Sequence, residues 1–254
     1  MKTSLTNTIS SGLIVLYILT GTIPNFDAID ILAPQWVYLC GLNILVALYL
    51  LNNKEKFASF FSIFSKSYFF IFYVFFILWA ALSYNYAINK AETIINFPRY
   101  FNVFAAICFV TILLSNMPSR FRFISVVLTS FLFLEVVLYY NQFIDQITTS
   151  DVFNSLALKG FSGNKNIAAA SMVIKLPFAL YLLLTIKKTW AKIVLLLLLS
   201  LSYIALTIIY ARAALLSSTF IMILFVAYQF YVFFFKGRSF KKLVSHSAFI
   251  VLPF

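Results

Sequence analysis

Charged residues are scarce in this chain. Asp, Glu, Lys and Arg make up 10% of its 254 residues, whereas soluble domains carry about 25%. Hydrophobic residues make up 63%, and the mean hydropathy is +0.99. Uncharged runs such as IVLLLLLSLSYIALTII, residues 193–209, approach the roughly 20 residues that a helix needs to cross a bilayer. This composition excludes an ordinary soluble domain and indicates an all-α, polytopic membrane protein.

The residue types that usually carry metal and cofactor chemistry are also few. Cys40 and Cys108 stand singly in apolar runs, so neither a disulfide nor a C-x-x-C site is indicated. His246 is the single histidine, and no cluster of other ligand types accompanies it. The sequence has no phosphate-binding loop, dinucleotide-binding glycine pattern or Ser/His/Asp arrangement. We therefore expect no metal and no cofactor.

Apolar segments recur along the whole chain. We interpret them as one transmembrane helix bundle, a single domain over residues 1–254 with about eight complete spans and a partial ninth. They lie near 9–23, 32–51, 67–83, 97–114, 121–142, 166–186, 191–210 and 213–235, with the ninth beginning near 243. Because only about 12 residues remain there, we expect the chain to be the N-terminal part of a longer protein.

Positive charge alternates between the connections. Most of the 19 Lys and Arg residues fall on the side of the N-terminus, and such residues collect in cytoplasmic loops. This pattern predicts a cytoplasmic N-terminus. It also explains the net charge of +12, because a protein whose partner is the lipid bilayer places its basic residues in cytoplasmic loops; no nucleic-acid partner is therefore expected. It also places the loop ending in FSGNKN, residues 161–166, on the outer face.

Two charges are predicted inside spans, where each costs roughly 2.5–3.5 kcal/mol unless it faces a cavity or a partner. Lys175 lies nine residues into the sixth span, and Glu135 lies about five residues before the outer end of the fifth. A lysine stem can bend several ångströms toward the interface, so the two could pair or line an outer cavity. Alternatively, Lys175 reaches a backbone carbonyl freed by Pro177.

Three further cations are predicted at the outer ends of spans. Arg99 follows a proline at the start of the fourth span, Lys165 opens the sixth, and Arg212 stands in a very short turn before the eighth. Guanidinium groups and helix N-termini both favour phosphate-like anions. The alternative for the arginines is an interfacial anchor whose side chain reaches water.

The polar stretch before the sixth span carries turn signals. Gly160 and Gly163 allow a sharp backbone turn. Asn164 or Asn166 can cap the following helix, but capping needs one asparagine rather than two with Lys165 between them. Gly163, Asn164 and Asn166 are therefore also expected to shape or contact an anion site.

Three stretches together resemble the O-antigen ligase and O-antigen polymerase superfamily of bacterial inner membranes. They are GFSGNKNIAAASMVIKLPFAL (160–180), IIYARAALLSSTF (208–220) and LWAALSYNYAINKAETIINFPRYF (78–101). That family shows an N-x-N element opening one span, a Ser-Arg-Gly/Ala element opening a later span, and an arginine ending the loop after the third span. Ala211 stands here where the family usually has serine, and a lysine lies between the asparagines.

The resemblance implies a glycosyltransferase of lipopolysaccharide or polysaccharide biosynthesis in the bacterial inner (cytoplasmic) membrane. Such enzymes move a glycan from undecaprenyl pyrophosphate to a lipid or saccharide acceptor at the periplasmic face, without a metal. It implies that Arg212 binds the pyrophosphate with Arg99 assisting, and that Asn164, Lys165 and Asn166 contact the same site. The family's catalytic histidine is expected beyond residue 254, so the catalytic residue is unknown here and this part alone is expected to be inactive.

Two other classes of protein fit the same residues. A non-enzymatic transporter or flippase for a lipid-linked saccharide or small anion would use Glu135 and Lys175, because intramembrane charges often mark transport paths. A structural membrane subunit would use neither. A long polar outer loop with a histidine in the sequence after Phe254 would favour the transferase.

Overall fold

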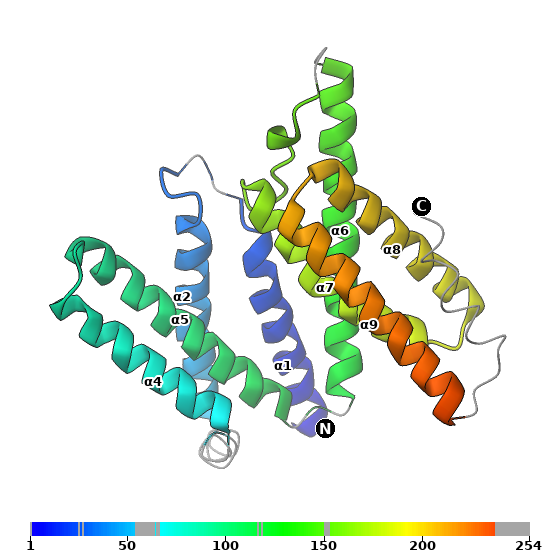
Figure 1. The fold of residues 1–254 in the computed structure, drawn as a ribbon. Coiled ribbons are helices and arrows are strands. Elements are labelled where there is room, and N and C mark those ends of the chain that lie inside the picture. Colours follow the sequence, from blue (N-terminus) through cyan, green and yellow to red (C-terminus); the bar gives the residue numbers. More distant parts are fainter. Residues whose placement is uncertain are drawn as a thin grey trace. The chain divides into compact units, whose positions relative to one another are not determined.

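The computed structural model describes residues 2–24, 26, 28–53, 64, 67–115, 117, 119–149 and 153–236. This part of the chain is helical and contains no strand, so the predicted all-α class is confirmed there. Its α-helices are α1 (Lys2–Leu19), α2 (Ala33–Asn52), α4 (Tyr68–Leu82), α5 (Lys90–Ser115), α6 (Arg120–Thr149), α7 (Lys165–Thr185), α8 (Thr189–Ile209) and α9 (Arg212–Lys236) (Figure 1). The partial ninth segment and His246 lie outside the described residues.

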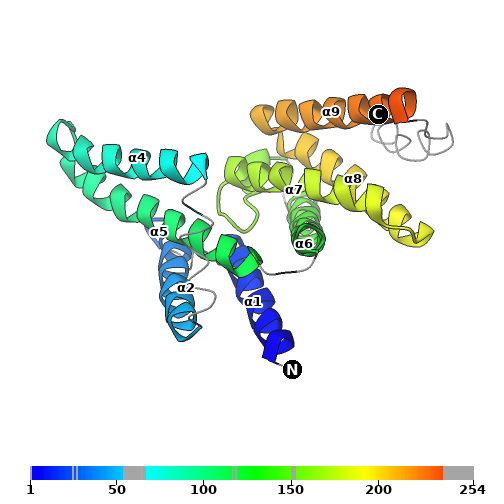
Figure 2. The same cartoon turned by 90° about the horizontal axis from the view of Figure 1, so that it is seen from below.

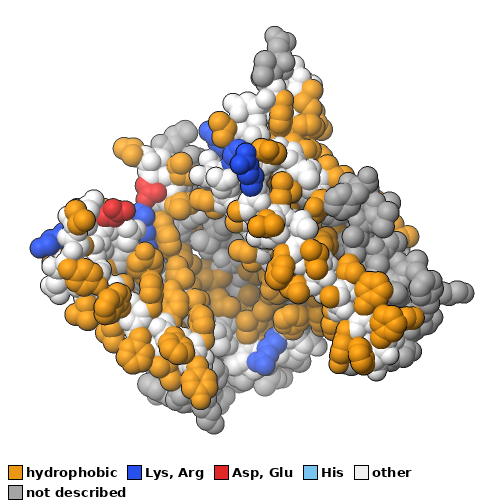
Figure 3. Space-filling model, viewed as in Figure 1, with side chains coloured by type: hydrophobic (Ala, Val, Ile, Leu, Met, Phe, Trp, Pro, Cys, Tyr) orange, Lys and Arg blue, Asp and Glu red, His pale blue; other side chains and the backbone are white. Residues whose placement is uncertain are grey.

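Most of these helices expose large hydrophobic side chains. Seven helices in the described residues, α2 and α4 to α9, are long and apolar enough to cross a membrane. None of the residues of α4 is buried, although its sequence YFFIFYVFFILWAAL is almost wholly hydrophobic. Figure 3 shows the result, a face covered by hydrophobic side chains with few charged ones. A surface of this kind requires an apolar environment or a partner.

The chain divides into two compact units, Met1–Arg120 and Phe121–Phe254. In the first, called unit 1, α5 packs against α1, α2 and α4, and α4 and α5 form a helical hairpin (Figures 1 and 2). In the second, called unit 2, α7 packs against α8 and α9, while α6 crosses these helices (Figure 2). The sequence-predicted sites therefore belong to one unit or the other.

A polar network joins three helices inside unit 1. The side-chain amide of Asn43 on α2, which is buried, donates to the backbone carbonyl of Asn102 on α5 at 2.9 Å and also bonds the Asn102 side chain. Tyr17 of α1 donates its hydroxyl to Asn43 Oδ1 at 2.7 Å. Asn102 in turn donates to the carbonyl of Trp36. Hydrogen bonds of this kind link helices whose other contacts are apolar and interchangeable.

Helix α7 forms the centre of unit 2. More than half of the residues in its most apolar stretch are buried. These buried residues recur at helical spacing along one face. The small residues Ala168 and Ala169 lie among them near its start, where they allow neighbouring backbones to approach closely. The core also includes Leu132 and Tyr139 of α6 and residues of α8 and α9.

The predicted start of the fourth helical segment at residue 97 is wrong. α5 begins at Lys90 and contains Pro98 in its interior. The Asn89 side chain accepts from the backbone N–H of Glu92 at 3.2 Å, which caps the helix in polar sequence ahead of the apolar run. Pro98 removes only one backbone hydrogen bond. Arg99 consequently lies in the third turn of α5, at about 3.6 residues per turn, and not at its start.

The predicted end of the fifth segment at residue 142 is also wrong, because α6 continues to Thr149. The hydroxyl groups of Thr148 and Thr149 donate to the carbonyl of Asp145 at 2.9 and 2.7 Å, so polar side chains in this extension are satisfied within the helix. Glu135 therefore lies 14 residues before the end of α6, about 21 Å at 1.5 Å per residue, whereas the sequence predicted about five residues.

We expect Asn43→Leu to destabilise unit 1, because the hydroxyl of Tyr17 and the side-chain oxygen of Asn102 lose their partner. Such hydrogen bonds contribute about 0.6 kcal/mol on average and up to about 1.7 kcal/mol, and thermal unfolding of the detergent-purified protein measures the loss. Asn53→Leu is the matched control, since the Asn53 amide bonds the Tyr49 carbonyl of its own helix. Equal melting temperatures for the two variants would contradict the network's role.

Candidate functional site

The start of α7 is built by a tight turn that requires glycine. Gly160 and Gly163 both have positive φ, at +58° and +69°, where side chains other than glycine are strained. A Cβ on Gly160 would also lie 3.0 Å from both Ala168 Cβ and the Tyr139 hydroxyl. The backbone N–H of Gly160 donates to Gln142 Oε1 at 3.1 Å, which ties the turn to α6.

Asn164 caps α7. Its Oδ1 accepts from the backbone N–H groups of Asn166 and Ile167 at 2.9 and 3.4 Å, and these are among the N–H groups that a helix start leaves without partners. Asn166 is exposed, and its side-chain amide has no hydrogen bond within the described part of the chain. One asparagine therefore has a structural role, and the second remains available to a ligand.

Lys165 is the first residue of α7, and its side chain turns back toward the preceding loop. Its Nζ lies 3.3 Å from the hydroxyl of Ser155, and the side chain is half-buried. A hydroxyl does not neutralise the ammonium charge. The structure thus holds a full positive charge at the helix start, where the backbone N–H groups also favour anions.

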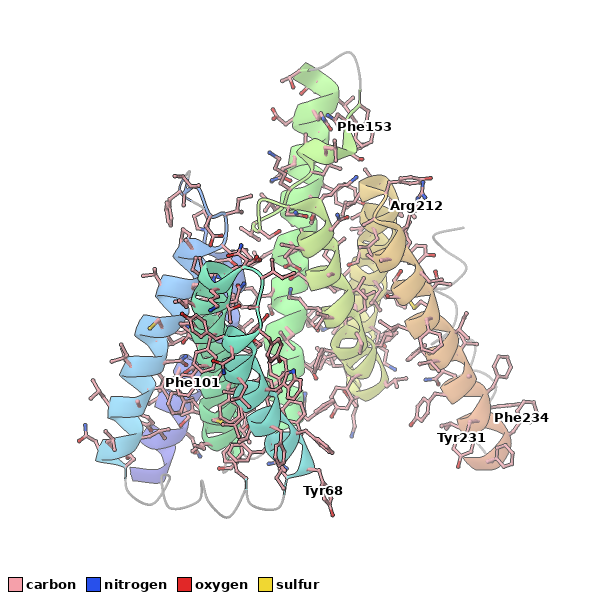
Figure 4. The ribbon with its side chains drawn as sticks, turned by 60° about the vertical axis from the view of Figure 1, so that its left-hand side comes forward. Tyr68, Phe101, Phe153, Arg212, Tyr231 and Phe234 are labelled. Carbon is pink, nitrogen blue, oxygen red and sulfur yellow. The ribbon has the colours of Figure 1, made fainter. Side chains whose placement is uncertain are left out.

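Arg212 is the first residue of α9 and is exposed. Tyr210 adopts a left-handed conformation with φ of 56° and ends α8, so the connection to α9 is as short as the sequence suggested. The guanidinium lies over the Tyr210 ring, 5.6 Å from its centre, which restricts its position. Figure 4 shows Arg212 at one end of α9, with Tyr231 and Phe234 toward the other end.

Lys165 and Arg212 lie at the same end of unit 2. α8 runs antiparallel to both α7 and α9, and α7 and α9 pack side by side (Figures 1 and 2), so the two helix starts point the same way. Neither cation has a carboxylate partner in the described residues. We call this region, formed by Lys165, Arg212 and the first turns of α7 and α9, the cationic end. Two helix N-termini and two unpaired cations make it suitable for a phosphate-like anion.

Arg99 belongs to unit 1 and has partners of its own. Its guanidinium forms an ion pair with Asp30 and lies 5.6 Å from the centre of the Trp36 ring. The sequence offered no signal for Asp30, because the loop before α2 shares no spacing with α5. The partial neutralisation by Asp30 makes Arg99 a weaker anion ligand than Arg212, although its five donors exceed what one carboxylate uses.

The predicted contact between Glu135 and Lys175 is present in the structure. Lys175 Nζ lies 2.8 Å from Glu135 Oε1, and the two residues are only 9% and 7% exposed, respectively. Ser171, one turn before Lys175, donates its hydroxyl to the same carboxylate oxygen at 2.7 Å. Lys175 also donates to the Ser171 carbonyl at 3.1 Å. That carbonyl is not the one freed by Pro177, which belongs to Val173, so the alternative interpretation of Lys175 is not needed.

One oxygen of the Glu135 carboxylate has no hydrogen bond within the described residues. Glu135 Oε2 is buried and has no hydrogen-bond partner in the described residues, and the same holds for the hydroxyl of Tyr139, one turn further along α6. Buried polar atoms are normally satisfied by protein or by ordered water. The ion pair is therefore a polar centre inside the helical core, with Ser171 as a member that helical spacing could have revealed in the sequence.

Groups of three or more His, Cys, Asp or Glu side chains that could hold a metal ion are not found in the part of the chain that the structure describes. Cys40 and Cys108 are free thiols there, the first exposed and the second buried. The polar chemistry of the described residues consequently rests on cations, amides, hydroxyls and single carboxylates.

Comparisons of the chain with protein-family models, with curated proteins and with solved structures find no match.

We expect Lys175→Met to destabilise unit 2 by about 3–5 kcal/mol, because it leaves the Glu135 carboxylate buried without its counter-charge. Unfolding in detergent measures this effect. Glu135→Gln combined with Lys175→Met should restore most of the loss, since no buried charge remains. Ser171→Ala should cost about 1 kcal/mol, the contribution of one hydrogen bond. Additive losses in the double variant would contradict a direct ion pair.

Proposed function

We propose that the chain is a multi-pass protein of the bacterial cytoplasmic membrane, with its N-terminus in the cytoplasm. The seven long apolar helices and the exposed hydrophobic surface support a membrane location. The alternation of basic connections supports the orientation. In this orientation the cationic end of unit 2 faces the periplasm.

The proposed activity is transfer of a glycan from undecaprenyl pyrophosphate to a lipid or saccharide acceptor, as in the O-antigen ligases and polymerases that three sequence stretches resemble. The observation that carries it is the cationic end, where Lys165 and Arg212 open two parallel, packed helices. A departing pyrophosphate develops negative charge at the membrane surface, and fixed cations with helix N–H groups stabilise that charge.

Each residue of the cationic end has a proposed role in this reaction. Arg212, exposed and restrained by the Tyr210 ring, binds the pyrophosphate through two of its donors. Lys165 adds a second charge, and the exposed Asn166 amide adds a neutral donor. Gly163 and Asn164 place these groups by shaping the turn and capping the helix. Arg99 belongs to unit 1, where its ion pair with Asp30 makes it a separate and weaker anion ligand.

A transporter or flippase for a lipid-linked saccharide or small anion is the second candidate. The buried pair of Glu135 and Lys175 favours it, because such charges inside apolar helices often line transport paths. The variant Glu135→Gln/Lys175→Met separates the two candidates. Glycan transfer would continue in this variant if the protein is a transferase, whereas movement of the saccharide would stop if the pair carries transport.

The proposed orientation predicts which connections a membrane-impermeant maleimide can reach in intact spheroplasts. In a background with Cys40→Ser and Cys108→Ser, Leu156→Cys should be labelled from outside, because it precedes α7 and is exposed. Lys188→Cys, in the connection between α7 and α8, should be labelled only after permeabilisation. Labelling of Lys188→Cys alone in intact spheroplasts would reverse the orientation.

We expect Arg212→Ala to lower glycan transfer by about 100-fold or more, the usual effect of removing a group that stabilises charge in the transition state. The assay follows labelled glycan from undecaprenyl pyrophosphate to acceptor, with the intact protein in membranes. Arg122→Ala is the matched control, because Arg122 is an exposed arginine in the first turn of the antiparallel helix α6. Near-normal transfer by membrane-inserted Arg212→Ala would reject the assigned role.

A further inference from the structure

A polar pocket lies in unit 1, in the hairpin of α4 and α5. Its volume is about 300 Å³, at the lower end of the roughly 300–1,000 Å³ typical of small-molecule sites. Ala80 and Ser83 line it from the end of α4 and the turn that follows. The remaining lining residues come from the start of α5 and the residue before it: Asn89, Glu92, Thr93, Asn96, Phe97 and Tyr100. We call it the α4–α5 pocket.

Helix spacing explains why these residues share one face. Glu92, Asn96 and Tyr100 recur every four residues, as do Asn89, Thr93 and Phe97, and these two rows are adjacent on a helix. The rows occupy the first turns of α5, the part that extends ahead of the apolar run. The extension thus forms a polar helix face opposite α4, in a hairpin whose outer surface is almost entirely apolar.

Three of the lining side chains retain hydrogen-bonding capacity. The Asn96 amide and the Tyr100 hydroxyl have no hydrogen bond within the described residues. Glu92 has only a long contact, 3.5 Å from Asn89 Nδ2 to Oε2, which leaves its other oxygen unused. Amide, hydroxyl and carboxylate together offer both donors and acceptors in one hollow. The rings of Phe97 and Tyr100 add apolar surface beside them.

The charge of the lining indicates the class of ligand. No lysine or arginine lines the α4–α5 pocket, and the nearby Lys90 lies over the Tyr84 ring, 5.3 Å from its centre. A phosphate would meet the Glu92 carboxylate without a counter-charge, so the pocket disfavours anions. Neighbouring hydroxyl groups of a sugar can donate to a carboxylate and exchange bonds with an amide, while the C–H face of the ring packs on aromatic side chains.

We propose that the α4–α5 pocket binds one neutral saccharide unit through Glu92, Asn96 and Tyr100. The biological use of this site, as a subsite for the glycan of the donor or acceptor, rests on the proposed glycan transfer. Binding of a free sugar does not depend on transfer, so the two proposals can fail separately. The pocket belongs to unit 1 and contains none of the residues of the cationic end.

Saturation-transfer NMR with the intact protein in lipid nanodiscs tests the proposal. The ligands are glucose, galactose, rhamnose and N-acetylglucosamine, each titrated alone, with choline as a cationic competitor. At least one sugar should receive saturation from the protein. Asn96→Leu and Glu92→Gln should each weaken its binding by about tenfold, the effect of losing one well-placed hydrogen bond to a charged or desolvated group. Thermal unfolding checks that both variants remain folded.

Lys90→Gln is the matched control, because Lys90 is exposed at the start of the same helix but does not line the pocket. It should bind the sugar as the wild type does. Absence of saturation transfer to all four sugars, equal binding by folded Asn96→Leu, or binding of choline in their place would overturn the proposal.

Discussion

The ion pair between Glu135 and Lys175 is the interaction on which the geometry of unit 2 depends. The pair and Ser171 lie in a core that is mostly apolar. Sliding α7 along α6 by a turn would replace one set of apolar contacts with a similar one. The same movement would leave two buried charges unpaired, at a cost of about 3–5 kcal/mol. The pair therefore specifies the register of the two helices. In this register Gly160 meets Gln142 and Tyr139 of α6, while the start of α7 itself is defined by the glycine turn and the Asn164 cap.

Unit 1 obtains the same specificity from amides. Asn43 and Asn102 bond one another between α2 and α5, and Arg99 lies one turn before Asn102 on the same helix. The network that fixes α5 against α2 therefore also determines how Arg99 meets Asp30 and Trp36. In both units, a few buried polar side chains that bond across helices determine how otherwise apolar helices align. The stability variants proposed for these contacts address that alignment directly.

The sequence allowed the helices and their order to be predicted, since long apolar runs without charge have few other solutions. It also offered Glu135 as one of two possible partners of Lys175, beside a backbone carbonyl, because a buried charge demands a partner. Helix ends were predicted poorly. Apolar content marks where a helix is hydrophobic, whereas caps such as Asn89 and side chains such as those of Thr148 and Thr149 decide where it stops. Contacts between distant loops and helices, such as Asp30 with Arg99, left no local pattern to follow.

Two groups of polar residues that do not align the helices differ in the sign of their charge. The cationic end of unit 2 has Lys165 and Arg212 without a carboxylate partner in the described residues, while the α4–α5 pocket of unit 1 has Glu92 without a base. A lipid-linked glycan combines the two matching chemistries in one molecule, an anionic pyrophosphate and an uncharged sugar. An ion transporter would have use for the first and none for the second. The proposed transferase substrate therefore offers a chemical match to each of these groups of residues taken separately, whereas a small anion matches only the cationic end.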